Sequence, residues 1–450
     1  MGLSALPVRS NQVNCVRVRI PTVRTSLLLA AVPWAAALVA GCRWLSSGVE
    51  YPDAVTVEWR VLAELSNGVR VYNGGYGSAI APHPTRKGYF YLLTDRGPNV
   101  DTAQSVEKRF VRPSFTPRIE LFTLDGTRLA GVQVIELKDS AGRRLTGLPN
   151  PPVADGNGEV AVDLTGQRLP FDPDGIDPEG LVALRQGGFW ISDEYGPHLL
   201  HVDRTGRTIE RVSPAAKNRQ GHALPKVFAL RRPNRGMEGL TITSDGRLLV
   251  GIMQSALDNP SAAVRTTTRA TRLLTYDLVT GATHQFVYLQ EQPDLSNSEI
   301  ASLSRTEFLV LERDDRFGGD PAAPAPIKRI YKVDLNGATD LSDSADRTSG
   351  RLFDGDTLEQ LTDEQFRSAG IVPVAKTLVA DLLALPGGYP HDKPEGLAIL
   401  DRQLLAVCND DDFGITSDGS GALIQKIFPA VGNIVDRSQV FFLKLKAPLW

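Results

Sequence analysis

A short pattern that recurs along the chain constrains its fold more than any other feature. Each copy opens with a glutamate and a short apolar strand, passes through a polar turn, and continues as a second apolar strand that ends in polar residues. Four clear copies and a looser fifth occupy residues 178–193, 237–254, 298–314, 394–410 and 77–96. Two apolar strands joined by a tight polar turn are typical of an antiparallel hairpin. The chain is therefore predicted to repeat one β-hairpin.

Radial repetition of such a hairpin favours a β-propeller, in which only short strand edges stay exposed. Glu179, Glu238 and Glu299 are 59 and 61 residues apart, whereas the flanking copies lie 96 and 101 residues away. The two long intervals either hide a degenerate blade each or carry insertions. We therefore expect an all-β propeller of six or seven blades. Further strands are predicted at 118–126, 199–206, 273–278 and 330–335, and a short helix at 357–366.

The chain is expected to form a single domain after an N-terminal export signal. Its 41 glycines and 30 prolines are spread along the sequence, as turns at every hairpin require, and 42% hydrophobic residues suffice for a packed core. We assign residues 42–69 to a linker and residues 70–450 to the propeller. Its last strand, 439–445, would close the ring onto the N-terminal segment.

Residues 1–41 have the composition of an export signal. They contain four arginines and no acidic residue, and their apolar run, 27–40, is too short to span a bilayer. The run ends in Val-Ala-Gly-Cys, which is similar to the lipobox of bacterial lipoproteins, in which the cysteine (here Cys42) is lipidated. We predict a lipoprotein signal peptide and an exported protein of the bacterial cell envelope, anchored by lipid in the periplasm or at the outer membrane. A plain export signal, or a start codon downstream of Met1, are the alternatives.

Several functional classes are excluded by composition and motifs. Three cysteines exclude a disulfide scaffold, and Cys408, inside an apolar strand, is expected to be a buried packing residue. Loss of the four leader arginines from a chain of net charge −3 leaves a mature charge near −7, which gives no basis for nucleic-acid binding. The six histidines lack zinc-ligand spacing, and no nucleophile elbow or phosphate-binding glycine loop occurs. We expect a monomer that meets the membrane only through its anchor.

The polar residues of the repeats would converge on one mouth of the propeller channel. Carboxylates gathered there repel one another and stay ionised only with a metal cation or basic side chains among them. Oxygen ligands without clustered Cys or His suit Ca²⁺ or Mg²⁺. Interleaved Arg and Lys recognise an anion such as phosphate. Both together suit metal-assisted hydrolysis of a phosphate ester.

Three sets of residues are predicted to form this site. The metal ligands, with Ca²⁺ as the expected ion, are Asp95, Glu179, Glu238, Glu299, Glu395 and Asp410. The catalytic carboxylates are Glu179, Asp193, Glu194 and Glu238. The residues expected to bind a small-molecule phosphate ester or another anionic ligand are Arg96, Arg235, Lys393, Tyr195 and His198.

The same residues also have structural interpretations. An acidic residue at a strand end often accepts hydrogen bonds from the backbone amides of a turn. A recurring glutamate can equally latch one blade to its neighbour. A non-enzymatic propeller that binds a ligand or partner, and a lactonase-like propeller with a single metal, are therefore the alternative functions.

Several of these segments resemble one known family. The segments are 94–99, 177–182, 188–197, 234–240 and 393–397. They are similar to the phytase-like family, also called "esterase-like activity of phytase", over roughly residues 70–430. The resemblance implies an exported propeller that hydrolyses phosphoric esters, by analogy with calcium-dependent propeller phytases. The Asp-Asp-Pro-Ala segment of those phytases has only a partial counterpart here, in residues 319–322.

Overall fold

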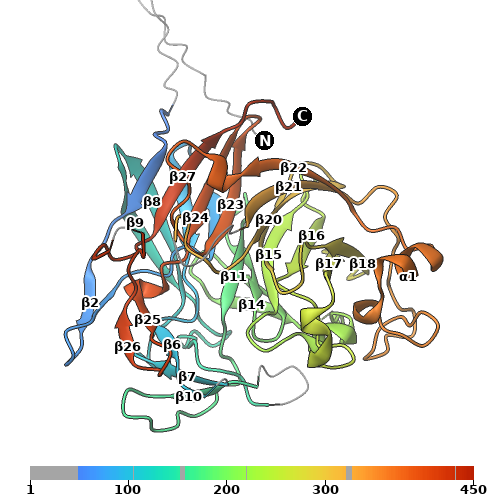
Figure 1. The fold of residues 1–450 in the computed structure, drawn as a ribbon, viewed down its shortest axis with the longest axis horizontal. Helices are drawn as coiled ribbons and strands as arrows, with labels where there is room; N and C mark the ends of the chain where they lie inside the picture. Colours follow the sequence, from blue (N-terminus) through green and yellow to red (C-terminus); the bar gives the residue numbers. More distant parts are fainter. Residues whose placement is uncertain (1–48, 105, 153–157, 219, 321–326, 431) are drawn as a thin grey trace, which may run out of the picture. The chain divides into compact units, whose positions relative to one another are not determined.

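The unit of the structure is a four-stranded sheet (Figure 1). The computed structural model describes residues 49–450 except 105, 153–157, 219, 321–326 and 431. The predicted signal peptide and Cys42 lie outside the described residues. Each predicted hairpin forms the two inner strands of one sheet, which confirms the interpretation of the repeats.

Five such four-stranded units, the blades, follow one another among the described residues, and the first and fifth are hydrogen-bonded into one eight-stranded sheet. The first consists of β4 (Ala79–Pro82), β5 (Tyr89–Leu93), β8 (Arg118–Asp125) and β9 (Arg128–Glu136). The second consists of β11 (Pro178–Ala183), β12 (Phe189–Asp193), β13 (His198–Val202) and β14 (Thr208–Val212). The third consists of β15 (Met237–Ile242), β16 (Leu248–Met253), β17 (Ala270–Asp277) and β18 (Thr283–Leu289). The fourth consists of β19 (Ser296–Ser302), β20 (Glu307–Arg313), β21 (Lys328–Asp334) and β22 (Ala375–Asp381). The fifth consists of β23 (Pro394–Asp401), β24 (Leu404–Asn409), β27 (Gln439–Lys444) and β1 (Ala54–Val57).

The innermost strands close into a ring. Strands β4, β11, β15, β19 and β23 each contact the next one around it, and β23 contacts β4. The predicted closure by the last strand is confirmed, because β27 pairs in antiparallel fashion with β1. Strand β1 lies in the segment assigned to a linker, and it also pairs in parallel with β9. This all-β arrangement is a β-propeller.

The described residues form five blades, so the expectation of six or seven blades is wrong. The long intervals in the repeat hold insertions rather than degenerate blades. The first carries β6 (Asn99–Asp101), β7 (Glu107–Phe110) and β10 (Val160–Val162), which form a separate sheet. The second carries the 3₁₀ turn η3 (Leu358–Gln360) and the short helix α1 (Asp363–Ser368), near the predicted helix. An insertion and a blade occupy similar lengths of chain, so spacing alone did not distinguish them.

The remaining elements connect or flank the blades. Hairpin β25 (Ile415–Ser417) and β26 (Leu423–Gln425) follows the turn η5 (Asp412–Gly414), and β25 lies beside β6 (Figure 1). Near the start of the described chain, β2 (Val61–Glu64) pairs with β3 (Arg70–Tyr72). The other 3₁₀ turns are η1 (Lys226–Leu230), η2 (Ala262–Thr266) and η4 (Leu382–Ala384). No helix in the described part of the chain combines the length and the apolar character that a membrane crossing needs.

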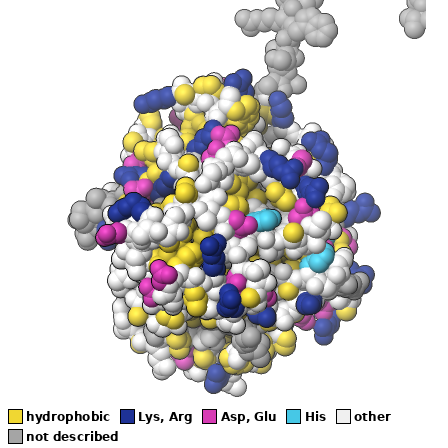
Figure 2. Space-filling model, turned by 90° about the vertical axis from the view of Figure 1, so that its right-hand side faces the viewer, with side chains coloured by type: hydrophobic (Ala, Val, Ile, Leu, Met, Phe, Trp, Pro, Cys, Tyr) yellow, Lys and Arg dark blue, Asp and Glu magenta, His cyan; other side chains and the backbone are white. Residues whose placement is uncertain are grey.

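The hydrophobic core lies between neighbouring blades. Each interface has its own buried cluster, and the pairs that exemplify them are Leu93 with Leu181, Trp190 with Leu240, Val250 with Ile300, Leu311 with Leu397, and Ile80 with Ala406. Cys408 is buried in the last of these clusters, as expected. The outer face that carries α1 mixes basic, acidic and apolar side chains (Figure 2), so no field of one sign covers it.

Glycines allow the inner strands to approach closely around the ring. A Cβ atom on Gly239 would lie 2.5 Å from the backbone nitrogen of Ile300 on the next blade. A Cβ on Gly180 would lie 2.6 Å from the nitrogen of Leu240, and one on Gly396 would lie 2.8 Å from that of Ile80. Since backbone cannot move aside as a flexible side chain can, the glycine of the repeated motif is a packing requirement.

Replacement of Gly239 by alanine is expected to lower the free energy of unfolding by about 1–3 kcal/mol, the usual range for overpacking. The added methyl group must push two blades apart. Denaturant unfolding followed by tryptophan fluorescence measures the effect. Gly419→Ala is the matched control, because a Cβ there meets no atom within 4 Å. Equal midpoints for the two variants would contradict the packing argument.

Candidate functional site

A cavity of about 480 Å³ lies at the rim where the inner strands begin. Residues from all five blades line it, together with parts of β6, β7, β25 and β26. Eleven carboxylates and six Lys or Arg side chains of the described residues face it. The predicted convergence of the repeat ends on one mouth therefore matches the geometry.

The strand registers identify two equivalent positions in each blade. Leu181 pairs with Ile191, and the corresponding pairs elsewhere are Leu240 with Gly251, Ile300 with Val310, Leu397 with Val407, and Ile80 with Leu92. The position two residues before the first partner is occupied by Ser78, Glu179, Glu238, Ser298 and Glu395. The position three residues after the second partner is occupied by Asp95, Glu194, Gln254, Arg313 and Asp410. All five residues of the latter set line the cavity, as do the three glutamates of the former.

Glu299 does not belong to this set, contrary to its prediction as a metal ligand. The register places Ser298 at the glutamate position and Glu299 where three of the other blades have glycine and the first has Ala79. A shift of one residue turns a side chain to the other face of a strand. The buried carboxylate of Glu299 accepts hydrogen bonds from the backbone nitrogens of Leu240 and Ile300, both at 2.9 Å. It latches the fourth blade to the third.

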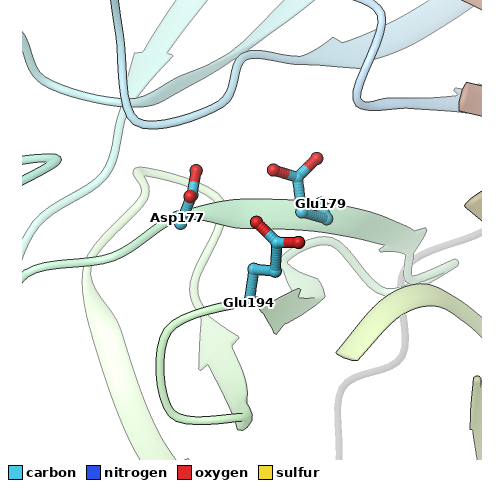
Figure 3. A group of neighbouring side chains, drawn as sticks. All are labelled: Asp177, Glu179 and Glu194. Carbon is cyan, nitrogen blue, oxygen red and sulfur yellow. The ribbon is translucent and has the colours of Figure 1, made fainter. Parts of the chain in front are cut away.

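Three buried carboxylates converge in the cavity wall. Asp177, Glu179 and Glu194 each offer an oxygen atom, and these atoms lie within 4.8 Å of one another. Figure 3 shows the side chains of Glu179 and Glu194 directed into the same space, with Asp177 beside them. One oxygen of Glu194 (Oε1) and one of Glu238 (Oε2) are buried without a hydrogen-bond partner among the described residues. Unpaired carboxylate oxygens of this kind fit a hard cation such as Ca²⁺.

Mutual repulsion and burial disturb the protonation of these groups. Burial, and then the charge of Glu238, raise the pKa of both Glu179 and Glu194 well above the ordinary value. Burial together with the charge of Glu395 raises the pKa of Glu238 to about 8. Burial and nearby carboxylates also raise the pKa values of Glu395 and Asp410 to about 7. A bound cation would favour the ionised forms and reverse these shifts.

Two lysines line the same cavity and pair with its other carboxylates. The Lys393 ammonium lies 3.2 Å from Asp410 and 2.5 Å from Asp412. Lys426 Nζ lies 2.7 Å from the second oxygen of Asp412 and 2.9 Å from Asp392. Asp412 thus bridges two lysines, whose attraction holds the pKa of that carboxyl well below its usual range despite burial.

Three arginines complete the charge pattern. Arg96 is buried and lies 2.6 Å from Glu159 and 3.4 Å from Asp177. Arg313 lies 2.6 Å from Glu395 and is also buried. Arg235 is less engaged, since it donates to Ser296 at 2.9 Å and approaches Asp315 only at 3.5 Å. Of these three arginines, Arg235 is therefore the one best placed to meet an anion.

Asp193, Tyr195 and His198, predicted as catalytic and substrate-binding residues, do not line the cavity. Asp193 accepts hydrogen bonds from the backbone nitrogens of Asp177 (2.9 Å) and Tyr195 (3.0 Å), and its second oxygen lies 2.5 Å from His198 Nδ1. The buried Tyr195 hydroxyl donates to the carbonyl of Gly147 at 2.7 Å. Their contacts fix the turn that carries Glu194, so they position the site.

Eight charged residues that line the cavity were not among the predicted site residues. They are Asp101, Lys108, Asp177, Arg313, Asp315, Asp392, Asp412 and Lys426. Asp177 immediately precedes the second hairpin, and Asp412 ends an acidic run, so both carried a detectable signal. Lys426 follows the inserted hairpin β25–β26, outside any repeat, and nothing in the sequence indicated it.

The raised pKa values predict how pH affects the metal-free protein. A carboxyl whose pKa rises from 4.5 to about 8, as for Glu238, keeps its proton when folded at pH values where the unfolded chain has lost it. The folded state then binds more protons, so the free energy of unfolding falls as pH rises between these values. We expect a higher Tm at pH 5 than at pH 8 in the presence of chelator, and recovery at pH 8 on addition of Ca²⁺. A Tm that rose with pH in chelator would contradict the assignment.

Fold and site together define a class: a five-bladed propeller with a carboxylate-rich, cation-flanked cavity at one rim. Residues 72–413 match the phytase-like family, described as "Esterase-like activity of phytase". The chain belongs to this family.

Other similarities are more distant. An uncharacterized secreted protein of Arthroderma benhamiae is 29% identical over 326 residues, which cover 56% of this chain and 62% of that protein. A GH43 β-1,3-galactosidase structure is 11% identical, with 86% of this chain and 93% of that chain covered and a TM-score of 0.36. Virginiamycin B lyase from Staphylococcus aureus is 10% identical, with 86% and 100% covered and a TM-score of 0.30. At these scores the two structures carry no functional argument.

Proposed function

We propose that the protein is a metal-assisted ester hydrolase and that its substrate is a phosphate ester. The observation that supports this most strongly is the juxtaposition of Asp177, Glu179 and Glu194, with a partnerless Glu194 oxygen, and cationic side chains across one cavity. The description of the family, esterase-like activity of phytase, points in the same direction.

The acidic and basic residues of the cavity would have separate roles. Asp177, Glu179 and Glu194 would hold Ca²⁺, which supplies Lewis acidity toward the phosphoryl oxygens and toward a water molecule. Lys393 and Arg235 would bind the remaining phosphoryl oxygens. Oxygen-only ligands favour Ca²⁺ or Mg²⁺ over zinc, since no Cys or His lines the cavity among the described residues.

Glu238 would act as the general base: it would take a proton from the attacking water molecule and pass it to the leaving oxygen. Its Oε1 accepts a hydrogen bond from Gln254 Nε2 at 2.8 Å, which orients the carboxyl, while Oε2 has no partner among the described residues.

A lactonase-like activity is the second candidate. Eleven carboxylates against six cations leave the cavity with an acidic excess. Such an excess disfavours a highly charged anion and favours a neutral ester, whose carbonyl a single cation would polarise.

A substrate screen tests the proposal. Purified protein is treated with chelator and assayed on p-nitrophenyl phosphate, inositol hexakisphosphate, p-nitrophenyl acetate and a γ-lactone, with and without Ca²⁺. Ca²⁺-dependent release of phosphate supports the first candidate, and Ca²⁺-dependent lactone opening alone supports the second. If none of the substrates is turned over in a metal-dependent way, both candidate activities are contradicted and a non-enzymatic binding propeller is favoured.

Export, lipid anchoring and a monomeric state are part of the same proposal. The secreted relative from Arthroderma benhamiae supports export, and the lipobox-like segment before Cys42 supports an anchor in the bacterial envelope. We expect Cys42→Ser to shift the protein from the detergent phase to the aqueous phase of a partitioning experiment. Unchanged partitioning would refute the anchor.

A further inference from the structure

The hairpin β25–β26 forms an outer wall of the cavity and has two different faces. Ile415 and Leu423 pack in an apolar cluster with Phe413, on the side away from solvent. Residues opposite each other in a hairpin share a face, and neighbours along a strand alternate. The cross-strand pair Thr416–Ile424 therefore lies on the other face. Ile424 lines the cavity and remains 41% exposed.

Further apolar side chains extend this wall. Ile427 also lines the cavity and is 41% exposed, and the ring of Phe317 lines it close by. The Lys426 ammonium lies 5.6 Å from the centre of the Phe317 ring. An apolar surface thus adjoins the lysine pair that Asp412 bridges.

The outer wall offers little to additional negative charges. Its β6–β7 part contributes Lys108, whose ammonium contacts the carboxylate of Asp101 and lies 3.8 Å from Glu159. The β25–β26 part contributes uncharged side chains before Lys426. A second or third phosphate placed here would lose its hydration without gaining a free cation.

We propose that the substrate is an amphiphilic ester with one anionic group and one apolar substituent. The anionic group would lie deep in the cavity, near Lys393 and Arg235, and the substituent would pack on Ile424, Ile427 and Phe317. This inference rests on the proposed function for the identity of the anionic group. Beyond that function, it specifies a leaving group with an apolar substituent, and it disfavours a polyphosphorylated polyol as the substrate.

Alkyl phosphonates of increasing chain length test the inference, because they bind without being hydrolysed. We measure affinities of methyl-, butyl- and octylphosphonate by calorimetry in Ca²⁺, and turnover of the matching alkyl phosphates. Each packed methylene is expected to tighten binding about threefold to fourfold, so butylphosphonate should bind roughly 50-fold more tightly than methylphosphonate. The variants Ile424→Gln and Ile427→Gln should each reduce the ratio of octyl to methyl affinity. Val279→Gln is the control, since Val279 is 74% exposed and does not line the cavity.

The outcomes separate this inference from the proposed function. If the affinity for phosphonates rises with chain length but no ester is turned over, the proposal of an amphiphilic ligand is supported and the proposal of a hydrolase is contradicted. Turnover with affinities independent of chain length, or tighter binding of inositol hexakisphosphate than of octylphosphonate, would overturn the inference and retain the hydrolase. Failure of every phosphonate to bind would overturn the inference as well. If Ile424→Gln does not fold, Ile427→Gln alone gives the comparison.

Discussion

Replacement of Glu194 by glutamine is expected to weaken Ca²⁺ binding by about 100-fold or more, because loss of groups that only support a metal ligand already costs 10–100-fold. Glu194 belongs to the carboxylate trio, and its buried Oε1 has no hydrogen-bond partner among the described residues. The amide is nearly the same size but carries no charge. Calorimetry of the chelator-treated protein measures the affinity, and metal-dependent turnover of p-nitrophenyl phosphate should fall with it.

Glu299→Gln is the matched control for this experiment. Glu299 is as buried as Glu194 and was also predicted from the sequence, but its carboxylate accepts two backbone hydrogen bonds outside the cavity. We expect this variant to lose stability and to keep the Ca²⁺ affinity of the wild type. If instead Glu299→Gln lost Ca²⁺ and Glu194→Gln retained it, the metal site would have to be reassigned.

Replacement of Arg313 by methionine is expected to destabilise the protein by about 3–5 kcal/mol at pH 8, the cost of leaving a buried charge without its partner. Arg313 is 3% exposed and lies 2.6 Å from Glu395. Without that arginine the pKa of Glu395 rises further, because burial and the charge of Asp410 already raise it to about 7. At pH 5 the orphaned carboxyl is protonated in the folded state, so the loss of stability should be smaller there.

Arg128→Met provides the comparison for Arg313→Met. Arg128 pairs with Asp125 at 2.9 Å, but both side chains are more than half exposed. An exposed pair contributes about 0–1 kcal/mol and is screened by salt. Guanidinium unfolding curves at pH 5 and pH 8 measure both variants. A loss for Arg313→Met that does not depend on pH would mean that Glu395 is not the group left unpaired.

The architecture was largely predictable because its signals are local. Tight turns and alternating apolar strands identified all five inner hairpins, and the apolar strand at the end of the chain correctly indicated ring closure. The number of blades was not predictable from the same signals. An insertion such as β6–β7–β10 also consists of short strands and turns, and the distinction lies in which strands pair across long stretches of chain.

The site was predictable as a place and less so as a set of side chains. The ends of the repeated hairpins meet at one rim of the propeller. Glu179, Glu238, Glu395 and Asp410 therefore line the cavity, as predicted. The prediction for Glu299 was wrong because the repeats were aligned by their glutamates. That alignment placed Glu299 where the strand register has Ser298. The glycine that follows the glutamate in three other copies is absent after Glu299, and a shift of one residue reverses the direction of the side chain.

By itself, the sequence determined the hairpin repeat, the all-β class and the concentration of acidic groups at one edge, since these follow from hydrophobic alternation and turn chemistry within about twenty residues. Tertiary structure alone decided the closure at five blades, the meeting of Asp177, Glu179 and Glu194, and the arrival of Lys426 from an inserted hairpin. The physical reason is the range of the interactions. Strand pairing and turns act between neighbours in the chain, whereas metal-binding geometry and the pairing of buried charges depend on groups that only the closed ring brings together.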